Sequence, residues 1–337
     1  MSGGPFARRP GLAALLAGLF ALGAAALSLF LGPARLPASE VFGALLGGDV
    51  PAFARDIVRV DRLPRAELGL AVGAALAVAG VLFQALLRNP LADPYVVGVG
   101  PGALLGAAVG GALHVTGTAM LGVSAAGACA FVGAVLAAGL VLAVAGGGGR
   151  AASARLLLAG VAVGSFVTAV ATWALYVENQ SWQDAVRWLL GSLAFADGPR
   201  ISVAAVATVL LAGIAWAKGR ALDALALGED SARLIGVNVT STVRLLAAAG
   251  CLLVAAAVAT AGLVGFVGLV VPHAARRLVG PSHRGLIPVA AALGGGLLVL
   301  ADGIARQASH VEIPVGVVTA LLGAPIFALL VRRRPGA

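Results

Sequence analysis

Long apolar runs alternate with short polar segments along the whole chain. Each run is close to the about 20 residues that a helix needs to cross a bilayer, and its apolar positions are continuous rather than alternating, which favours helices over strands. The pattern predicts ten spans, at 11–31, 66–87, 95–114, 119–145, 153–176, 200–217, 241–261, 262–279, 286–305 and 314–331. Nine or eleven spans remain compatible with it, because no charge separates 241–261 from 262–279 and only the series Gly262, Gly265 and Gly268 indicates a turn there.

Composition indicates that lipid is the solvent of these helices. Hydrophobic residues make up 60% of the chain and charged residues 11%, with a mean hydropathy of +1.02. That is more apolar surface than one water-soluble core of 337 residues could bury. Although Arg8 and Arg9 precede the first run as in a signal peptide, the run is longer than the usual 7–15 residues, which favours a retained helix. We expect one all-α membrane domain over 1–337.

Charge placement predicts the orientation. If the N-terminus is cytoplasmic, the inside segments carry 15 of the 23 basic residues and four of the 14 acidic ones. An excess of Lys and Arg on the cytoplasmic side is what membrane insertion favours. The sequence therefore predicts a multi-pass protein of a bacterial inner membrane with both termini in the cytoplasm. Basic turns beside anionic lipid also account for the net charge of +9 without nucleic acid as a partner.

Motifs for nucleotide hydrolysis, metal binding and hydrolytic catalysis are absent from the sequence. The only lysine, Lys218, has neither the preceding glycine nor the following hydroxyl of a phosphate-binding loop. The four histidines are scattered, and neither His-Glu-x-x-His nor Gly-x-Ser-x-Gly occurs. Cys129 and Cys251 lie in apolar runs, where a small hydrophobe packs well. We expect no catalytic residue, no metal site and no cofactor bound by this chain.

The segments between spans differ in character. The stretch 32–65 combines Leu36, Val41 and Phe42 at roughly helical spacing, which predicts a short helix at the membrane interface. The cytoplasmic stretch 218–240 is polar yet dotted with leucines. Leucines within a polar segment are typical of a surface that packs against another protein.

Several motifs, in order along the chain, carry a family resemblance. They are Arg62-Leu63-Pro64-Arg65, the stretch from Gln84 to Pro94, the stretch from Gly265 to His273, Pro314-Val315-Gly316 and Leu322-Gly323-Ala324-Pro325. Over about residues 55–332 the chain resembles the permeases of binding-protein-dependent ABC importers for iron-siderophores, haem and cobalamin. The resemblance implies the type II importer architecture, with ten helices in two inverted five-helix halves. It also implies a homodimer, two ATP-binding subunits that use ATP and Mg, and a periplasmic or lipid-anchored substrate-binding protein.

Three arginines match the family's outer-face docking positions, namely Arg62, Arg65 and Arg306. The resemblance implies that they receive acidic side chains of the binding protein, a role that suits guanidinium groups. The alternative is pairing within the chain, with Asp61, Glu67 and Asp302 as the nearby acids.

Two cytoplasmic features also follow from the resemblance. Residues 221–237, within 218–240, match the segment that couples to the ATPase; the residues concerned are Leu227, Gly228, Glu229, Arg233, Leu234 and Gly236, with Ile235 as a further apolar anchor. A solvated loop is the alternative. The cytoplasmic gate of relatives matches Asn89 and Leu91 with the turn at Ser153 and Ala154. Ala154 stands where some relatives carry a hydroxyl, so this gate is expected to be more apolar.

The function implied is ATP-driven import by alternating access. An ion-coupled secondary transporter is the alternative, although such proteins usually place ionisable groups near mid-membrane. A membrane scaffold that transports nothing is a third reading, and it would not need the coupling segment. The sequence does not distinguish a siderophore, haem or cobalamin as the substrate, and it assigns no role to His273.

Overall fold

The computed structural model describes residues 6, 9–113, 124–146, 152–177, 190–308 and 312–332, and the regular elements of these residues are helices. On the N-terminal side they are α1 (Pro10–Ser28), α2 (Ala38–Leu46), α3 (Ala52–Asp56), the π-helix η1 (Ile57–Arg62), α4 (Leu63–Leu86), the 3-10 helix η2 (Pro94–Val97), α5 (Val99–Ala112), α6 (Ala125–Ala145) and α7 (Ala152–Val177). They continue with α9 (Gly198–Ala217), α10 (Gly219–Leu227), α11 (Glu229–Leu234), α12 (Val239–Ala261), α13 (Val267–Val279), α14 (His283–Gln307) and α15 (Val315–Arg332).

Within the described residues, seven helices are long and apolar enough to cross a membrane. Helices α5 and α15 are apolar but shorter, and α13 has only 13 residues. Helix α12 ends at Ala261 and is followed by Gly262, with a φ of 70°. Helix α13 begins after Phe266, whose φ of 66° is rare for a residue with a side chain. The chain therefore breaks between the two helices over 262–266, and the count of ten spans stays a prediction.

Helix α4 is the centre of the molecule. It packs against α9, α12, α13 and α14, and most of its residues are buried. A Cβ atom added at Gly73 would collide with the backbone of Gly294, and one added at Gly80 would collide with that of Gly268. Because lipid provides no hydrophobic drive between helices, close approach of this kind through small residues is what holds a membrane bundle together.

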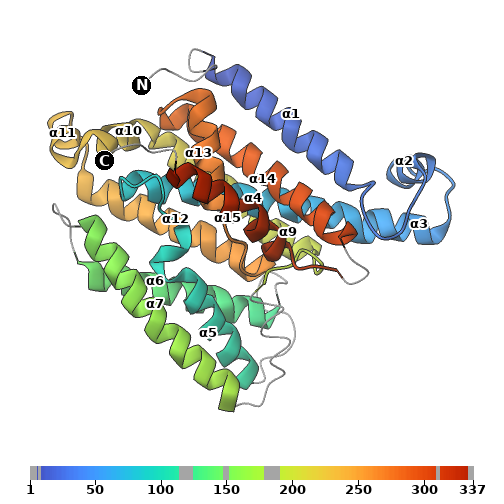
Figure 1. Ribbon diagram of the computed structural model, residues 1–337, viewed down its shortest axis with the longest axis horizontal. Coiled ribbons are helices and arrows are strands. Elements are labelled where there is room, and N and C mark those ends of the chain that lie inside the picture. The colour runs from blue at the N-terminus through green and yellow to red at the C-terminus, as the bar shows by residue number, and fades with distance from the viewer. Residues whose placement is uncertain are drawn as a thin grey trace.

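The long axis of the molecule has two distinct ends (Figure 1). Helices α2 and α3 lie at one end, shown at the right, and α10 and α11 lie at the other, with α4 and α14 running between them. Helix α1 packs along α14, while α5, α6 and α7 form a group on the opposite side. The chain thus offers two separate polar ends joined by a bundle.

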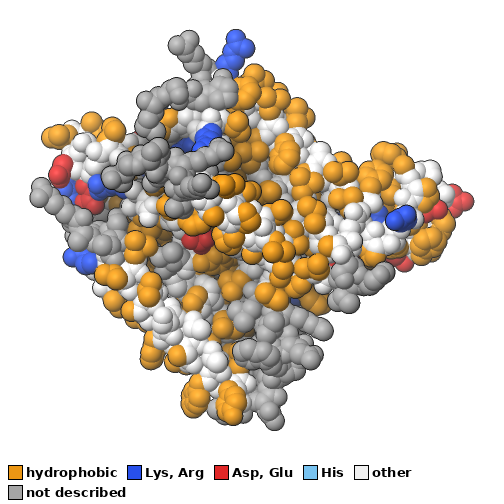
Figure 2. Space-filling model, viewed as in Figure 1, with side chains coloured by type: hydrophobic (Ala, Val, Ile, Leu, Met, Phe, Trp, Pro, Cys, Tyr) orange, Lys and Arg blue, Asp and Glu red, His pale blue; other side chains and the backbone are white. Residues whose placement is uncertain are grey.

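The surface between these ends is apolar. Figure 2 shows hydrophobic side chains across the middle of the visible face, with charged side chains gathered mainly toward the α10–α11 and α2–α3 ends. Exposed large apolar side chains lie on several outer helices, including Leu22 of α1, Leu136 of α6, Phe166 of α7 and Val209 of α9. A belt of this kind suits the hydrocarbon of a bilayer, so the chain is a multi-pass membrane protein.

Candidate functional site

Arg62 ends η1 at the α2–α3 end of the molecule and is almost fully buried, with 1% of its surface exposed. Its Nη1 atom donates to the carbonyl of Leu29 at 2.7 Å, and its Nη2 atom donates to the carbonyl of Ala34. These carbonyls follow α1, where the chain leaves its helix and needs donors for its backbone. Arg62 therefore fixes the connection between α1 and α2.

Arg65, one turn further along, lies behind two acidic side chains. Its Nε atom is 2.7 Å from Oδ1 of Asp61, and both of its Nη atoms donate to the carboxylate of Glu312. The Arg65 side chain is 9% exposed, whereas those of Asp61 and Glu312 are 44% and 39% exposed. A guanidinium held by two carboxylates at the surface can exchange a partner without leaving its place.

Arg306 comes from α14 and meets the same connection that Arg62 holds. Its Nε atom is 2.9 Å from Oδ2 of Asp302, and its Nη atoms donate to the carbonyls of Leu31 at 3.1 Å and Ser28 at 3.4 Å. The structure thus gathers the three predicted arginines at one end of the molecule. Arg65 pairs with Asp61 and Arg306 pairs with Asp302, as expected from the alternative of pairing within the chain. Glu67 is exposed.

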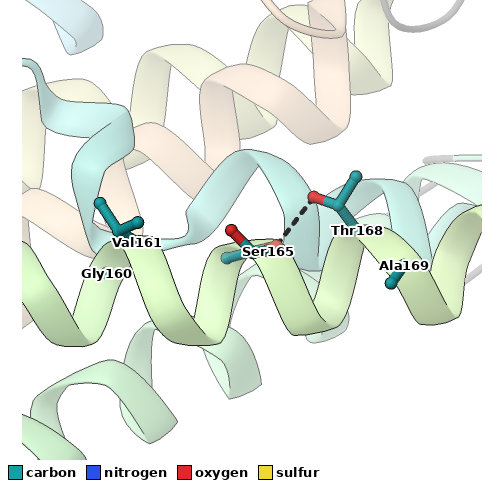
Figure 3. Close-up of a pocket in the computed structure, with 6 residues that line it drawn as sticks. Gly160, Val161, Ser165, Thr168 and Ala169 are labelled. Carbon is teal, nitrogen blue, oxygen red and sulfur yellow. Dashed lines mark hydrogen bonds between the residues drawn. The ribbon is translucent and has the colours of Figure 1, made fainter.

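A shallow groove runs along one face of α7 (Figure 3). It has a volume of about 570 Å³ and is lined by Gly160, Val161, Gly164, Ser165, Thr168 and Ala169. These positions recur every three to four residues, so they share one face of the helix. Thr168 Oγ1 donates to the carbonyl of Gly164 at 2.8 Å, which leaves the groove with hydroxyl oxygens and no charge.

A second groove, of about 430 Å³, lies on α15 beside Leu190. Its lining is Leu190, Gly316, Val317, Ala320, Leu321, Ala324 and Pro325. Sequence reasoning identified neither groove, because which face of a membrane helix stays open depends on how its neighbours pack. The spacing of glycine and hydroxyl residues in α7 was the available signal.

The segment between α4 and η2 makes a tight polar turn. Arg88 has a φ of 47°, Asn89 Oδ1 accepts from the backbone of Leu91 at 3.0 Å, and Asp93 Oδ1 accepts from the backbone of Tyr95 at 2.8 Å. Burial raises the pKa of the Asp93 carboxyl, and the hydrogen bond from Tyr95 opposes that rise. Asn89 and Leu91 are half-buried. The side chains of Ser153 and Ala154 lie outside the described residues, so the predicted gate stays a prediction.

The predicted coupling segment forms two short helices, α10 and α11, separated by Gly228 with a φ of 125°. Leu227 is 81% exposed and Leu234 is 88% exposed, and Ile235 is exposed beside them. Gly236, with a φ of 83°, turns the chain after α11. These apolar side chains stand at a polar end of the molecule, where a protein surface would cover them better than water does.

Ion pairs and a small core hold this segment in place. Glu229 lies 3.1 Å from Nη2 of Arg233 and 3.8 Å from Nη2 of Arg88. On the inner side, buried residues of the segment and of α12 form a cluster that includes Leu86 at the end of α4; its buried members are Ala224, Leu225, Ala232 and Val239. The segment is therefore a folded element attached to α4 and α12, rather than a solvated loop.

The coupling segment makes one contact that the sequence did not predict. Asp223 of α10 pairs with His283 at the start of α14, with 2.6 Å between Oδ1 and Nδ1. Sixty residues separate the two in the chain, and neither stands in a recognisable motif. Burial alone would raise the pKa of Asp223, but hydrogen bonds from His283 and Ser282 outweigh it, so the pKa of the carboxyl is lowered.

The chain is similar to known membrane transport proteins. The model of the FecCD transport family matches residues 19–333. The chain is 43% identical to the cobalamin import system permease protein BtuC of Halobacterium salinarum over 293 residues, which is 87% of this chain and 78% of the relative. It is 39% identical to the ferric enterobactin transport system permease protein FepD of Escherichia coli over 328 residues, or 96% and 95% of the two chains. A solved inward-facing structure of a metal-chelate type ABC transporter matches with a TM-score of 0.81 and 28% identity, over 95% of this chain and 99% of that one.

Proposed function

Because the chain belongs to the FecCD transport family and is a permease subunit of an ABC importer, we propose that it carries cobalamin or an iron chelate into the cell. The subunit is not an enzyme, and the ion-coupled alternative is not supported by its relatives. ATP hydrolysis belongs to a separate ATP-binding subunit. The permease moves its cargo across the membrane without changing it covalently.

The observation that carries the proposal is the pair of short helices α10 and α11. Leu227 and Leu234 are almost fully exposed on an element that is otherwise held by buried contacts and ion pairs. Apolar side chains placed this way fit a groove in the cytoplasmic ATPase. With this end in the cytoplasm, α1 begins and α15 ends on the same side, as the charge distribution predicts.

The opposite end is proposed to receive the binding protein. Carboxylates of the binding protein would replace Asp61 or Glu312 on Arg65, since these acids are partly exposed and Arg65 is already positioned by them. Arg62 and Arg306 support the site by holding the 28–34 connection. Charge pairs of this kind steer encounter and fix register.

Two copies of the chain would enclose the transport path. The α7 groove offers small and hydroxyl side chains without charge, and the α15 groove is apolar. A path with these linings holds a large, partly polar chelate weakly, so the cargo can leave it. Tight binding is then left to the binding protein, and the movement of α10 and α11 drives the change of access.

Reconstitution tests the proposal. The permease, its ATPase and its binding protein are placed in liposomes, and uptake of cobalamin and of a panel of iron chelates that includes ferric enterobactin is measured with and without ATP. We expect ATP-dependent uptake of one of them that requires all three proteins. Accumulation against a gradient by the permease alone, or no ATP-dependent uptake of any cobalamin or iron chelate by the full complex, would contradict it.

A further inference from the structure

The coupling segment supplies the N-terminal cap of a helix that belongs to another part of the chain. Helix α14 begins at His283, and its own N-cap residue, Ser282, makes no capping hydrogen bond. Asp223 of α10 accepts the His283 backbone N–H at 2.9 Å and lies 2.6 Å from the ring Nδ1 atom. The first N–H groups of a helix lack partners within it, and its N-terminus favours an anion. Asp223 therefore caps the N-terminus of α14 although it belongs to another helix, α10.

The junction of α9 and α10 strengthens the same attachment. Trp216 Nε1 donates to the carbonyl of Arg284 at 3.1 Å, and the guanidinium of Arg284 lies 5.3 Å from the Trp216 ring centroid. The backbone at Gly219 passes so near that a Cβ atom there would be 2.8 Å from Cγ of Arg284. The coupling segment and the end of α9 thus meet the first turn of α14 through a carboxylate, an aromatic ring and a close backbone contact.

Helices α14 and α4 pack closely against each other. Gly73 of α4 and Gly294 of α14 meet backbone to backbone, and an added Cβ at either would collide with the other helix. Further along, Gly69 lies against Val299, with 3.0 Å between a built Cβ and Cγ2. Interiors packed this closely deform little and transmit displacement.

The other ends of these two helices lie at the proposed docking site, where Arg65 would receive the binding protein and Arg306 supports it. Arg306 lies in the last turn of α14, and Arg65 lies in the first turn of α4. Helix α14 has 25 residues and is therefore about 37 Å long, enough to join the two polar ends directly. Figure 1 shows both helices running from the α10–α11 end toward α2 and α3.

We propose that the α4–α14 pair is a strut between the ATPase contact and the docking site, and that Asp223 and His283 are the positioning residues that fasten the coupling segment to it. The inference rests on the coupling role proposed above for α10 and α11. Coupling between two sites is reciprocal. For binding free energies, the contact therefore sets both how strongly nucleotide changes binding-protein affinity and how strongly a docked binding protein changes nucleotide affinity. Stimulation of the ATPase by the binding protein depends on the same attachment.

Asp223→Ala in the reconstituted complex tests the inference. We expect both the stimulation of ATPase by the binding protein and the nucleotide-dependent change of its affinity to fall by about fivefold or more. The ATPase should still co-purify, because Leu227 and Leu234 are untouched. Asp197→Ala is the matched control, since Asp197 caps its own helix, α9, by accepting from Arg200 N at 2.8 Å. Native values for both quantities in Asp223→Ala would overturn the inference.

A second variant separates attachment from general loss of structure. In Asp223→Cys with His283→Cys, the reduced protein should show the weakened coupling of Asp223→Ala. A disulfide between the two positions replaces the lost contact, so oxidation should restore stimulation, whereas the two single-cysteine variants should not respond. Full coupling in the reduced protein, or failure of a completely formed disulfide to restore it, would count against the strut.

Failure of the strut is distinguishable from failure of the coupling assignment itself. Leu227→Asp with Leu234→Asp should prevent ATPase assembly or stimulation if α10 and α11 contact the ATPase. If this variant is impaired while Asp223→Ala is native, the strut alone is refuted. If the leucine variant is native as well, the coupling assignment fails with it.

Discussion

The three arginines show that one residue type can serve two purposes at one place. Arg62 and Arg306 bind backbone carbonyls of the 28–34 connection, whereas Arg65 binds two carboxylates that reach solvent. The sequence singled out all three and offered Asp61, Glu67 and Asp302 as local partners, of which Glu67 forms no ion pair with the residues that the structure describes, but it could not reveal the carbonyl contacts or Glu312. Those partners are distant in the chain, and only folding brings them together.

Substitution of Glu312 distinguishes docking from purely internal pairing at Arg65. If the binding protein competes with Glu312 for Arg65, Glu312→Gln should tighten binding of the binding protein and Arg65→Gln should weaken it, because a neutral amide holds a guanidinium less strongly. Equilibrium binding to the reconstituted permease measures both changes. Asp49→Asn, an exposed acid beyond α2, serves as the control. A weaker or unchanged affinity in Glu312→Gln would show that docking does not use this exchange.

The lowered pKa of Asp223 gives its contact with His283 a defined dependence on pH. A carboxyl whose pKa is lower in the folded state stabilises the fold above its unfolded pKa of about 4, and loses this effect as the pH falls through its folded value. Native protein should therefore lose more thermal stability between pH 5 and 3 than Asp223→Asn does. Thermal unfolding in detergent measures this difference. Equal losses in the two proteins would mean that Asp223 does not contribute.

At the scale of elements, the apolar pattern located helices better than it located their roles. The long runs correspond to α1, α4, α6, α7, α9, α12 and α14, since a continuous apolar run of about 20 residues is what a helix needs to cross the bilayer. That α4 would be central was not predictable, because its hydrophobicity resembles that of the helices facing lipid. The short helices α10 and α11 were expected only as a coupling segment, and their attachment to α14 depends on contacts 60 residues apart in sequence.

Two glycines of the bundle test what holds these elements together. A methyl group added at Gly73 collides with the backbone of Gly294, whereas Gly139 of α6 has open space around it. Gly73→Ala should destabilise the protein by about 1–3 kcal/mol through overpacking. Gly139→Ala should be neutral or stabilise it by about 0.4–1 kcal/mol through the lower entropy of the unfolded chain. Thermal unfolding of the two variants measures the contrast, and equal behaviour would refute the close α4–α14 packing.

At the scale of the whole molecule, the proposed roles lie in different places: partner binding at the two ends, and passage of the cargo along the faces between them. The proposed ATPase contact, the proposed docking site and the grooves lie on different elements, so the residues of each can be substituted without changing the residues of the others. The family motifs indicated the first two, because they involve recognisable turns. The grooves had no motif, since a path for a large cargo needs small side chains and space rather than particular reactive groups.

Blocking the α7 groove should therefore separate transport from ATP hydrolysis. Ser165→Phe with Thr168→Phe fills the face that Gly160 and Gly164 leave open, while α10, α11 and the arginines are unchanged. We expect uptake in liposomes to be lost and ATPase stimulation by the binding protein to persist. Val209→Phe adds similar bulk to an exposed position on α9 and should leave both intact. Undiminished uptake with the groove filled would mean that the cargo crosses along another face, because two added rings cannot share this space with a large chelate.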